Sequence, residues 1–287
     1  MKKFVISILI SSIGFSQSSQ ELDIWAKDAS IKSFEMFREI LSIPNDANQL
    51  DDIELNVRWC EEKFTDRGFI TKRIATPEAP LLLAEKTFSK ANETVLIYLQ
   101  IDGQPVDPSR WFQKNPYEPV LKKQNTEGHW EIIDWSNIIN YKDDWRIFAR
   151  STSDAKGPVV MFLNAMDVLK QKKLVPNFNI KVIMDFEEEL GSPNLPAAVN
   201  SNRKILSADH LIIFDGPKHR SGKPTLTFGA RGISTIKLTI HGPLTAQHSG
   251  HFGNYVPNPA LRMAKLLSSM KDDDGVVIIP GFYDGIS

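Results

Sequence analysis

The sequence is poor in cysteine. Its 287 residues include a single one, Cys60, which excludes a disulfide within the chain. Cys60 lies in the amphipathic helical pattern "IELNVRWCEEKF", directly before Glu61 and Glu62. A nucleophilic cysteine needs surroundings that lower the pKa of its thiol, whereas adjacent carboxylates raise that pKa. We therefore predict that Cys60 is a core residue and not a nucleophile.

The sequence also lacks an excess of charge of either sign. It has 34 lysine and arginine residues against 35 aspartate and glutamate residues, for a formal net charge of -1. A nucleic-acid-binding protein normally presents a basic face, so no nucleic-acid partner is expected. Hydrophobic residues make up 41% of the chain and charged residues 24%, which is typical of a globular protein with one large domain or two ordinary ones.

Long apolar runs are almost absent. The one at residues 4–15 is too short to cross a bilayer comfortably as a mature helix. Two lysines precede it and small serines follow it, as in a secretory signal peptide. The sequence therefore predicts a signal peptide over residues 1–20 and a secreted or periplasmic protein with no membrane attachment after cleavage. The alternative is a buried N-terminal helix.

The rest of the sequence alternates between helix and strand patterns, which is the rhythm of an α/β fold. Apolar residues recur every three or four positions in the segments that we expect to be helices, residues 21–42, 50–67 and 158–173. Short apolar runs bounded by turn residues predict strands at residues 68–76, 80–87, 94–100, 177–186 and 208–215. Residues 103–130 are expected to form a long polar connection.

Acidic side chains follow three of the predicted strands. Asp102, the Glu187–Glu189 run and Asp215 lie at strand ends, and Asp154 precedes a helix. Ligands of open α/β sheets collect at the carboxyl ends of strands. Clustered carboxylates repel one another unless a cation neutralises them, and divalent cations take oxygen and imidazole ligands from several elements. The pattern therefore predicts a divalent-cation site in which the glutamate run supplies both a ligand and a general base.

Each acidic position also has a plainer interpretation. A glutamate run is usually a solvated surface, although this one lies between a buried strand and a turn. Asp154 could cap the following helix, and Asp215 before Gly216 could be a turn residue.

The pattern changes from about residue 224. The segment "TLTFGARGISTIKLTIHGP" alternates between apolar and polar residues, which predicts the first strand of a second, α+β domain. A helix should follow Asn258, and another strand should start near residue 275. The helix residues expected to point inward are Ala260, Met263, Leu266 and Leu267.

Taken together, the motifs resemble the M20 metallopeptidases, and most closely their carnosinase-like dipeptidase branch. The segments that carry the resemblance, in chain order, are "LQIDGQPV", "ARSTSDAKG", "EELGS", "IIFDGP", "GARG" and "HSGHFGN". The resemblance implies an α/β fold with a zinc-peptidase-type mixed sheet flanked by helices, and an inserted α+β lid or dimerisation domain. Residues 21–228 would be the catalytic domain and residues 229–287 the start of the lid, so we expect the sequence to be incomplete.

The resemblance also implies roles for individual residues. Asp154 would bridge two metal ions, Glu189 would bind one of them and Asp215 the other. Glu188 would be the general base, and Asp102 would orient a histidine ligand two positions before it. A cis peptide bond is expected between Asp154 and Ala155.

A histidine of the lid domain belongs to the same pattern. His248 would reach a substrate or an oxyanion, often in the partner subunit of a dimer. His251 is a nearby rival for this role, and the alternative for both is a histidine in a surface loop.

The sequence departs from the family pattern at the first metal segment. Gln100 stands where the family has a histidine ligand, and a neutral amide oxygen is a poor zinc ligand. Glycines of the family's second motif are replaced by Ala149 and Ser151, and its second aspartate by Ala155, without loss of a ligand.

The implied function is the hydrolysis of a peptide or amide bond in a small peptide or N-acyl amino acid. The expected cofactor is one or two divalent ions, zinc first and manganese or cobalt otherwise, and the complete protein should form a homodimer through the lid. The main alternative is a non-catalytic binding protein that has lost a metal site through Gln100. A third reading, an interaction module without a site, is disfavoured because a decayed site should lose its carboxylates.

Overall fold

The computed structural model describes residues 19–216, 219–223 and 225–285 of the chain. The predicted signal peptide therefore lies almost entirely outside the described residues. The chain divides into two compact units, residues 1–217 and residues 218–287, which are treated separately below. No described helix is both long enough and apolar enough to cross a membrane.

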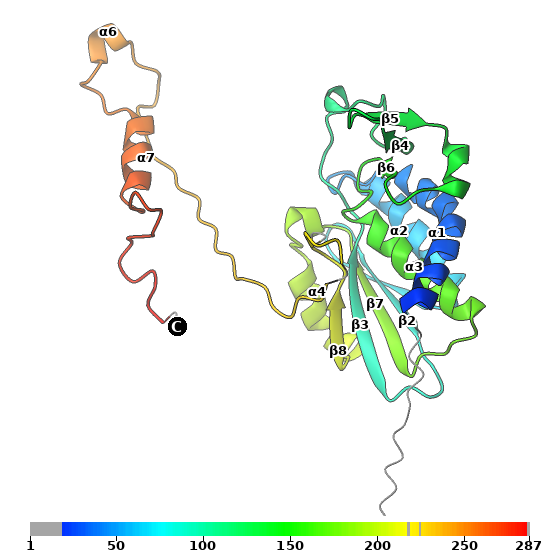
Figure 1. Cartoon of the computed structure of the whole chain (residues 1–287). Coiled ribbons are helices and arrows are strands. Elements are labelled where there is room, and N and C mark those ends of the chain that lie inside the picture. The colour runs from blue at the N-terminus through cyan, green and yellow to red at the C-terminus, as the bar shows by residue number, and fades with distance from the viewer. Residues whose placement is uncertain (1–18, 217–218, 224, 286–287) are drawn as a thin grey trace, which may run out of the picture. The chain divides into compact units, whose positions relative to one another are not determined.

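The first unit is built on a five-stranded mixed sheet (Figure 1). Its spatial order is β1-β2-β7-β3-β8. β1 pairs with β2 and β2 with β7 in antiparallel fashion, whereas β3 pairs with both β7 and β8 in parallel. The carboxyl ends of β3, β7 and β8 therefore lie side by side at one end of the strands, which is called the carboxyl edge below. The bounds are β1 Ile70–Ile74, β2 Leu81–Lys86, β3 Glu93–Gln100, β7 Phe178–Asp185 and β8 His210–Ile213.

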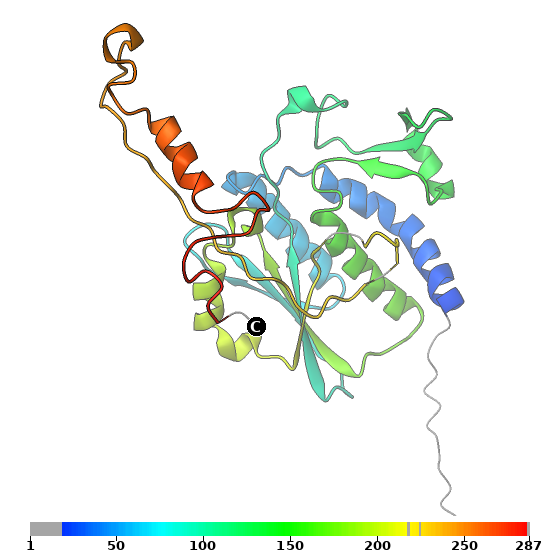
Figure 2. The same ribbon diagram turned by 60° about the vertical axis from the view of Figure 1, so that its left-hand side comes forward.

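Helices cover both faces of this sheet (Figures 1 and 2). One face packs against α1, α2 and α3 in the larger apolar core, through side chains such as Phe64, Leu99 and Leu163. The other face packs against α4 and α5, around Leu83, Ile183 and Leu206. The bounds are α1 Ser19–Leu41, α2 Leu50–Thr65, α3 Lys156–Gln171, α4 Leu195–Ser201 and α5 Arg203–Leu206.

These elements confirm the predicted α/β fold and its helices and strands to within a few residues. Alternation explains the strands: successive side chains of β3 point to opposite faces, so Ile97 and Leu99 join the larger core while Leu96 and Tyr98 join the smaller one. Cys60 is fully buried in α2 as a free thiol, and burial raises the pKa of that thiol. Its prediction as a core residue is confirmed.

The prediction of a polar connection over residues 103–130 is wrong in its second half. The chain there forms β4 Val120–Gln124, which pairs with β5 Trp130–Ile133 and β6 Arg146–Phe148 in a separate three-stranded sheet. One short 3₁₀ turn, Pro108–Arg110, precedes this sheet, and another, Trp135–Asn140, connects β5 to β6. β4 was missed because its lysines hide a half-buried strand: Lys122 is buried with its Nζ 4.3 Å from the ring centre of Phe148.

The second unit has helices but no strand among its described residues. They are α6 Ser249–Phe252 and α7 Pro259–Ser268, the latter capped by the Asn258 side chain, which accepts the Ala260 N–H at 2.8 Å. The strand predictions for residues 225–243 and from residue 275 are wrong. Apolar alternation indicates which face of a strand a residue would occupy, but a strand also needs a hydrogen-bonded neighbour. Among the described residues of the second unit, only an isolated bridge between Lys271 and Val277 is present.

The inward direction predicted for α7 is also only partly met. Met263 and Leu266 are half-buried, whereas Ala260 and Leu267 are exposed.

Candidate active site

The predicted acidic residues of the first unit gather at the shared carboxyl edge of β3, β7 and β8. Gln100 and Asp185, the last residues of β3 and β7, lie opposite each other in the strand register. Glu188 and Glu189 follow in a 3₁₀ turn, Glu188–Leu190. This edge arises because parallel strands, whose apolar runs are visible in the sequence, all end on the same side.

The pKa of the Glu188 carboxyl group is raised by its surroundings. The carboxyl is partly buried, and that burial raises its pKa. The negative charges of Glu189, Asp215 and Asp154 raise it further. The structure therefore brings these four carboxylates into one electrostatic neighbourhood, as the sequence predicts. A raised pKa makes a carboxylate a stronger proton acceptor.

Gln100 lies inside this group with its amide nitrogen toward the carboxylates. Its Nε2 donates to Asp154 Oδ1 at 3.2 Å and to Glu188 Oε2 at 3.3 Å. The side chain is buried, and its Oε1 has no hydrogen-bond partner. A second amide acts similarly, because Gln104 Nε2 donates to Glu189 Oε2 at 2.9 Å. Neutral amide groups thus donate hydrogen bonds to three of the acidic side chains, those of Asp154, Glu188 and Glu189.

Asp102 is buried at the end of β3. Its Oδ2 accepts the backbone N–H of Glu189 at 2.9 Å, and its Oδ1 has no partner. Burial raises the pKa of the Asp102 carboxyl to about 7; the negative charge of Asp185 raises it too, while the Glu189 N–H lowers it. In this chain Asp102 therefore holds the glutamate turn, and the residue two positions before it is Gln100 and not a histidine.

Asp154 lies just before α3, and the peptide bond from Asp154 to Ala155 is cis, as expected. The residue that caps α3 is Ala155, and no side chain donates or accepts a capping bond there. The plainer interpretation of Asp154 as a helix cap is therefore not met. Asp215 Oδ1, by contrast, accepts the neighbouring Gly216 N–H at 2.6 Å, which agrees with its plainer interpretation as a turn residue.

The segment before Asp154 is held against the end of β3 by Ser151. This residue has φ +59°, a conformation that glycine adopts freely and serine rarely does. Asn45 Nδ2 donates to Ser151 Oγ at 2.9 Å and to Ile101 O at 2.7 Å. A Cβ at Gly103 would lie 2.5 Å from Ser151 Oγ, so the two segments fit only with glycine there.

The buried ammonium of Lys156 anchors the start of α3. Its Nζ donates to Ile40 O, in the last turn of α1, at 2.9 Å and to Ile43 O, just after that helix. Burial lowers the pKa of Lys156 to about 7.

The predicted histidine lies in the second unit. His248 precedes α6, and its Nδ1 accepts the Gly250 N–H at 3.1 Å. The rings of His248 and His251 are 4.9 Å apart, so the two rivals are neighbours.

The donor set fits a divalent cation only in part. Asp154, Glu189, Asp215 and the free Gln100 Oε1 are hard oxygen donors of the type that divalent cations accept. The described histidines of the first unit, His129 and His210, lie beside Glu127 and Glu93 instead. Within the described residues, no three His, Cys, Asp or Glu side chains are arranged as a group that could hold a metal ion. The chemistry therefore suits an oxygen-bound cation, but the ligands are not preassembled around one.

The sequence analysis did not identify a hydrogen-bonded group that adjoins the glutamate turn. Asp185, Tyr98 and Ser192 meet through hydrogen bonds beneath the turn. A buried strand that ends in an aspartate two residues before an acidic run was the available signal.

Comparison with known sequences decides the family. Residues 97–252, more than half of the chain, match Peptidase family M20/M25/M40. The chain belongs to this family. Its mixed sheet flanked by helices is the fold of solved M20 peptidases. An M20 family metallo-carboxypeptidase from Sulfolobus solfataricus, Sso-CP2, superposes with a TM-score of 0.66 at 27% identity, over 89% of this chain and 53% of that one.

Curated M20 relatives are named as dipeptidases. The chain is 28% identical to Cys-Gly metallodipeptidase dug1 of Schizosaccharomyces pombe over 215 residues, which cover 74% of this chain and 40% of the relative. It is 29% identical to human Beta-Ala-His dipeptidase over 212 residues, or 73% of this chain and 38% of the relative. The chain thus matches about two fifths of the length of these M20 relatives.

Proposed function

We propose that the protein is a metal-dependent hydrolase that cleaves the peptide or amide bond of dipeptides, short peptides or N-acyl amino acids. The observation that carries this proposal is Glu188, whose pKa is raised by burial and by Glu189, Asp215 and Asp154 at one edge of the sheet. The M20 family assignment and the names of the dipeptidase relatives support the substrate class.

In this proposal the carboxylates divide the work. Asp154 would hold two cations in common, with Glu189 on one and Asp215 on the other, and Gln100 would be the remaining, weaker donor through its Oε1. A bound divalent cation supplies a Lewis acid that polarises the scissile carbonyl and lowers the pKa of water. Glu188 accepts the proton of the attacking water and delivers it to the leaving amine. We propose zinc as the cofactor, with manganese or cobalt as substitutes, and one or two ions.

The second unit completes the proposal. Residues 21–228 would form the catalytic domain and residues 229–287 would begin a lid through which two subunits pair. His248 would donate to the oxyanion that forms when water attacks the carbonyl. Residues 1–20 would direct export to the periplasm or outside the cell.

A second function, a non-catalytic binding protein, is favoured by one specific observation. The Gln100 amide already donates to Asp154 and Glu188, and no three ionisable ligands are arranged for a metal ion in the part of the chain that the structure describes. Such a site could bind a small molecule through its carboxylates without activating water.

The test is metal content together with dipeptide hydrolysis by the full-length gene product. Bound metal, turnover and a large loss of rate in Glu188→Ala would support the hydrolase, with the exposed Glu93→Ala as the matched control. No bound zinc, manganese or cobalt and no turnover would refute it. Activity that appears only in Gln100→His would assign the natural protein to the binding class.

A further inference from the structure

Asp185 is a buried carboxylate that the proposed mechanism does not use. It ends β7 and is 1% exposed. Its Oδ1 accepts the Glu187 N–H at 3.0 Å. Its Oδ2 accepts the hydroxyl of Ser192 at 2.7 Å and that of Tyr98 at 3.0 Å. A buried carboxylate is costly unless hydrogen bonds compensate it, and here three donors do so.

Two of these donors stand at either end of the turn that carries Glu188 and Glu189. Residues 187 and 192 are also joined through the backbone, because Ser192 N–H donates to Glu187 O at 3.0 Å. Gly191 and Ser192 both have positive φ, at +83° and +50°, so the chain turns at these two residues. The Asp185 side chain thus ties together the two ends of the turn, at Glu187 and Ser192.

A second buried aspartate holds the same turn from the neighbouring strand. Asp102 Oδ2 accepts the Glu189 N–H at 2.9 Å. Asn194 Nδ2 donates to Glu187 Oε2 at 2.8 Å and fixes the side chain that begins the turn. The turn is therefore tied to both β3 and β7, through atoms that do not belong to the reacting groups.

We propose that Asp185, with Tyr98 and Ser192, is a latch that positions Glu188 and Glu189 for cation binding and proton transfer. The inference rests on the proposed function. Catalytic groups need placement to within about 0.5 Å, and a misplacement of about 1 Å can cost about 10²-fold in rate. Asp185 is a positioning residue, since its three partners lie in the turn or on Tyr98. Phe186 beside it is packed independently in the larger core.

The test compares Asp185→Asn with Asp209→Asn in the full-length protein. Asp209 is the matched control because its side chain accepts a backbone N–H, that of Thr94, at 2.7 Å on the opposite edge of the sheet. Three quantities are measured: hydrogen exchange of the amides of residues 189–192, affinity for Mn²⁺ alone, and kcat and KM for a dipeptide. We expect Asp185→Asn to speed exchange about tenfold and to weaken Mn²⁺ about 10- to 100-fold, with the loss of rate mainly in kcat.

The readouts separate the latch from the proposed function. Unchanged exchange at residues 189–192 in Asp185→Asn, or an equal effect in Asp209→Asn, would overturn the latch. If the unmodified protein bound no Mn²⁺ and showed no turnover, the proposed function would fail, while the exchange result would still decide on the latch. Should Asp185→Asn not fold, Ser192→Ala and Tyr98→Phe each remove one hydroxyl donor and must show the same faster exchange to a smaller degree.

Discussion

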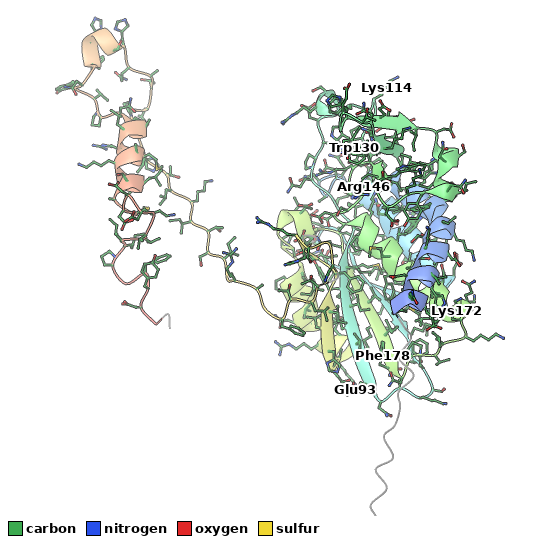
Figure 3. All side chains as sticks on the ribbon, in the orientation of Figure 1. Glu93, Lys114, Trp130, Arg146, Lys172 and Phe178 are labelled. Atoms are coloured by element: carbon green, nitrogen blue, oxygen red, sulfur yellow. The ribbon has the colours of Figure 1, made fainter. Side chains whose placement is uncertain are left out.

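The two ends of the parallel strands, the amino edge and the carboxyl edge of the central sheet, carry polar side chains in opposite settings. At the amino edge, Glu93 and His210 are 63% and 59% exposed and 3.3 Å apart (Figure 3, Glu93 labelled). At the carboxyl edge, Gln100, Asp102 and Asp185 are at most 3% exposed. Water solvates the first group, so the contact between Glu93 and His210 contributes little to stability. The second group is shielded from water and needs hydrogen-bond partners within the protein. Burial of Gln100, Asp102 and Asp185 distinguishes the carboxyl edge, although Asp154 and Asp215 beside them are exposed.

The largest expected contrast between the edges comes from Asp154→Asn. The variant keeps the shape of the side chain but removes the charge that accepts from Gln100 and is proposed to bridge the cations. We expect Mn²⁺ affinity to fall by at least about 100-fold, or about 2.8 kcal/mol, and dipeptide hydrolysis to be lost. Titration calorimetry and a hydrolysis assay check this, with Asp209→Asn unchanged in both. Retained cation affinity in Asp154→Asn would remove Asp154 from the site.

The second contrast is a dependence of stability on pH that originates at Asp102. The pKa of this carboxyl is raised from 3.8 to about 7 in the folded protein, mainly by burial. Its stabilisation is therefore fully present below the unfolded pKa and is lost as pH rises through the folded value. Between pH 4 and pH 7 the loss has a slope of up to about 1.4 kcal/mol per pH unit.

The measurement is urea unfolding of the protein and of Asp102→Asn, in the presence of a chelator. Asparagine can still accept the Glu189 N–H and does not titrate, so the variant should gain stability relative to the parent as pH rises from 5 to 7. A constant difference across that range would show that Asp102 does not titrate there.

A third contrast comes from changing a candidate metal ligand at the carboxyl edge. Gln100→His replaces a neutral amide by an imidazole, which zinc prefers. It also restores a ring N–H that Asp102 Oδ1, unpartnered at present, could accept. We expect zinc affinity to rise by about tenfold or more, equivalent to about 1.4 kcal/mol, with a smaller change for Mn²⁺. Equal gains for both ions would argue that Gln100 does not select the cation.

The sequence predicted where β3 and β7 end, because the signals for these strand ends are local. An apolar run followed directly by a carboxylate marks both the strand and its end, as in β3 before Asp102 and β7 before Glu187. The bonds of the latch are different: Tyr98 and Asp185 are 87 positions apart, and nothing near Tyr98 in the chain announces that contact.

The failures in the second unit have another cause. Residues 225–243 alternate as a strand should, yet the described chain offers no neighbour to pair with them. Periodicity reports which face a residue would occupy and is silent about the partner strand. The amide orientation of Gln100 was equally hidden, because it depends on Asp154 and Glu188, which lie 54 and 88 positions away.

The smallest effect should come from the amino edge itself. Glu93→Gln removes the charge that faces His210 across 3.3 Å of solvent-exposed surface. Exposed pairs of this kind contribute about 0–1 kcal/mol, because water screens the charges and two side chains must be ordered. Thermal unfolding should therefore be nearly unchanged, and hydrolysis and cation affinity fully so. A change in cation affinity as large as that expected for Gln100→His would mean that charge anywhere on the sheet matters, and that burial at the carboxyl edge is not what distinguishes the two.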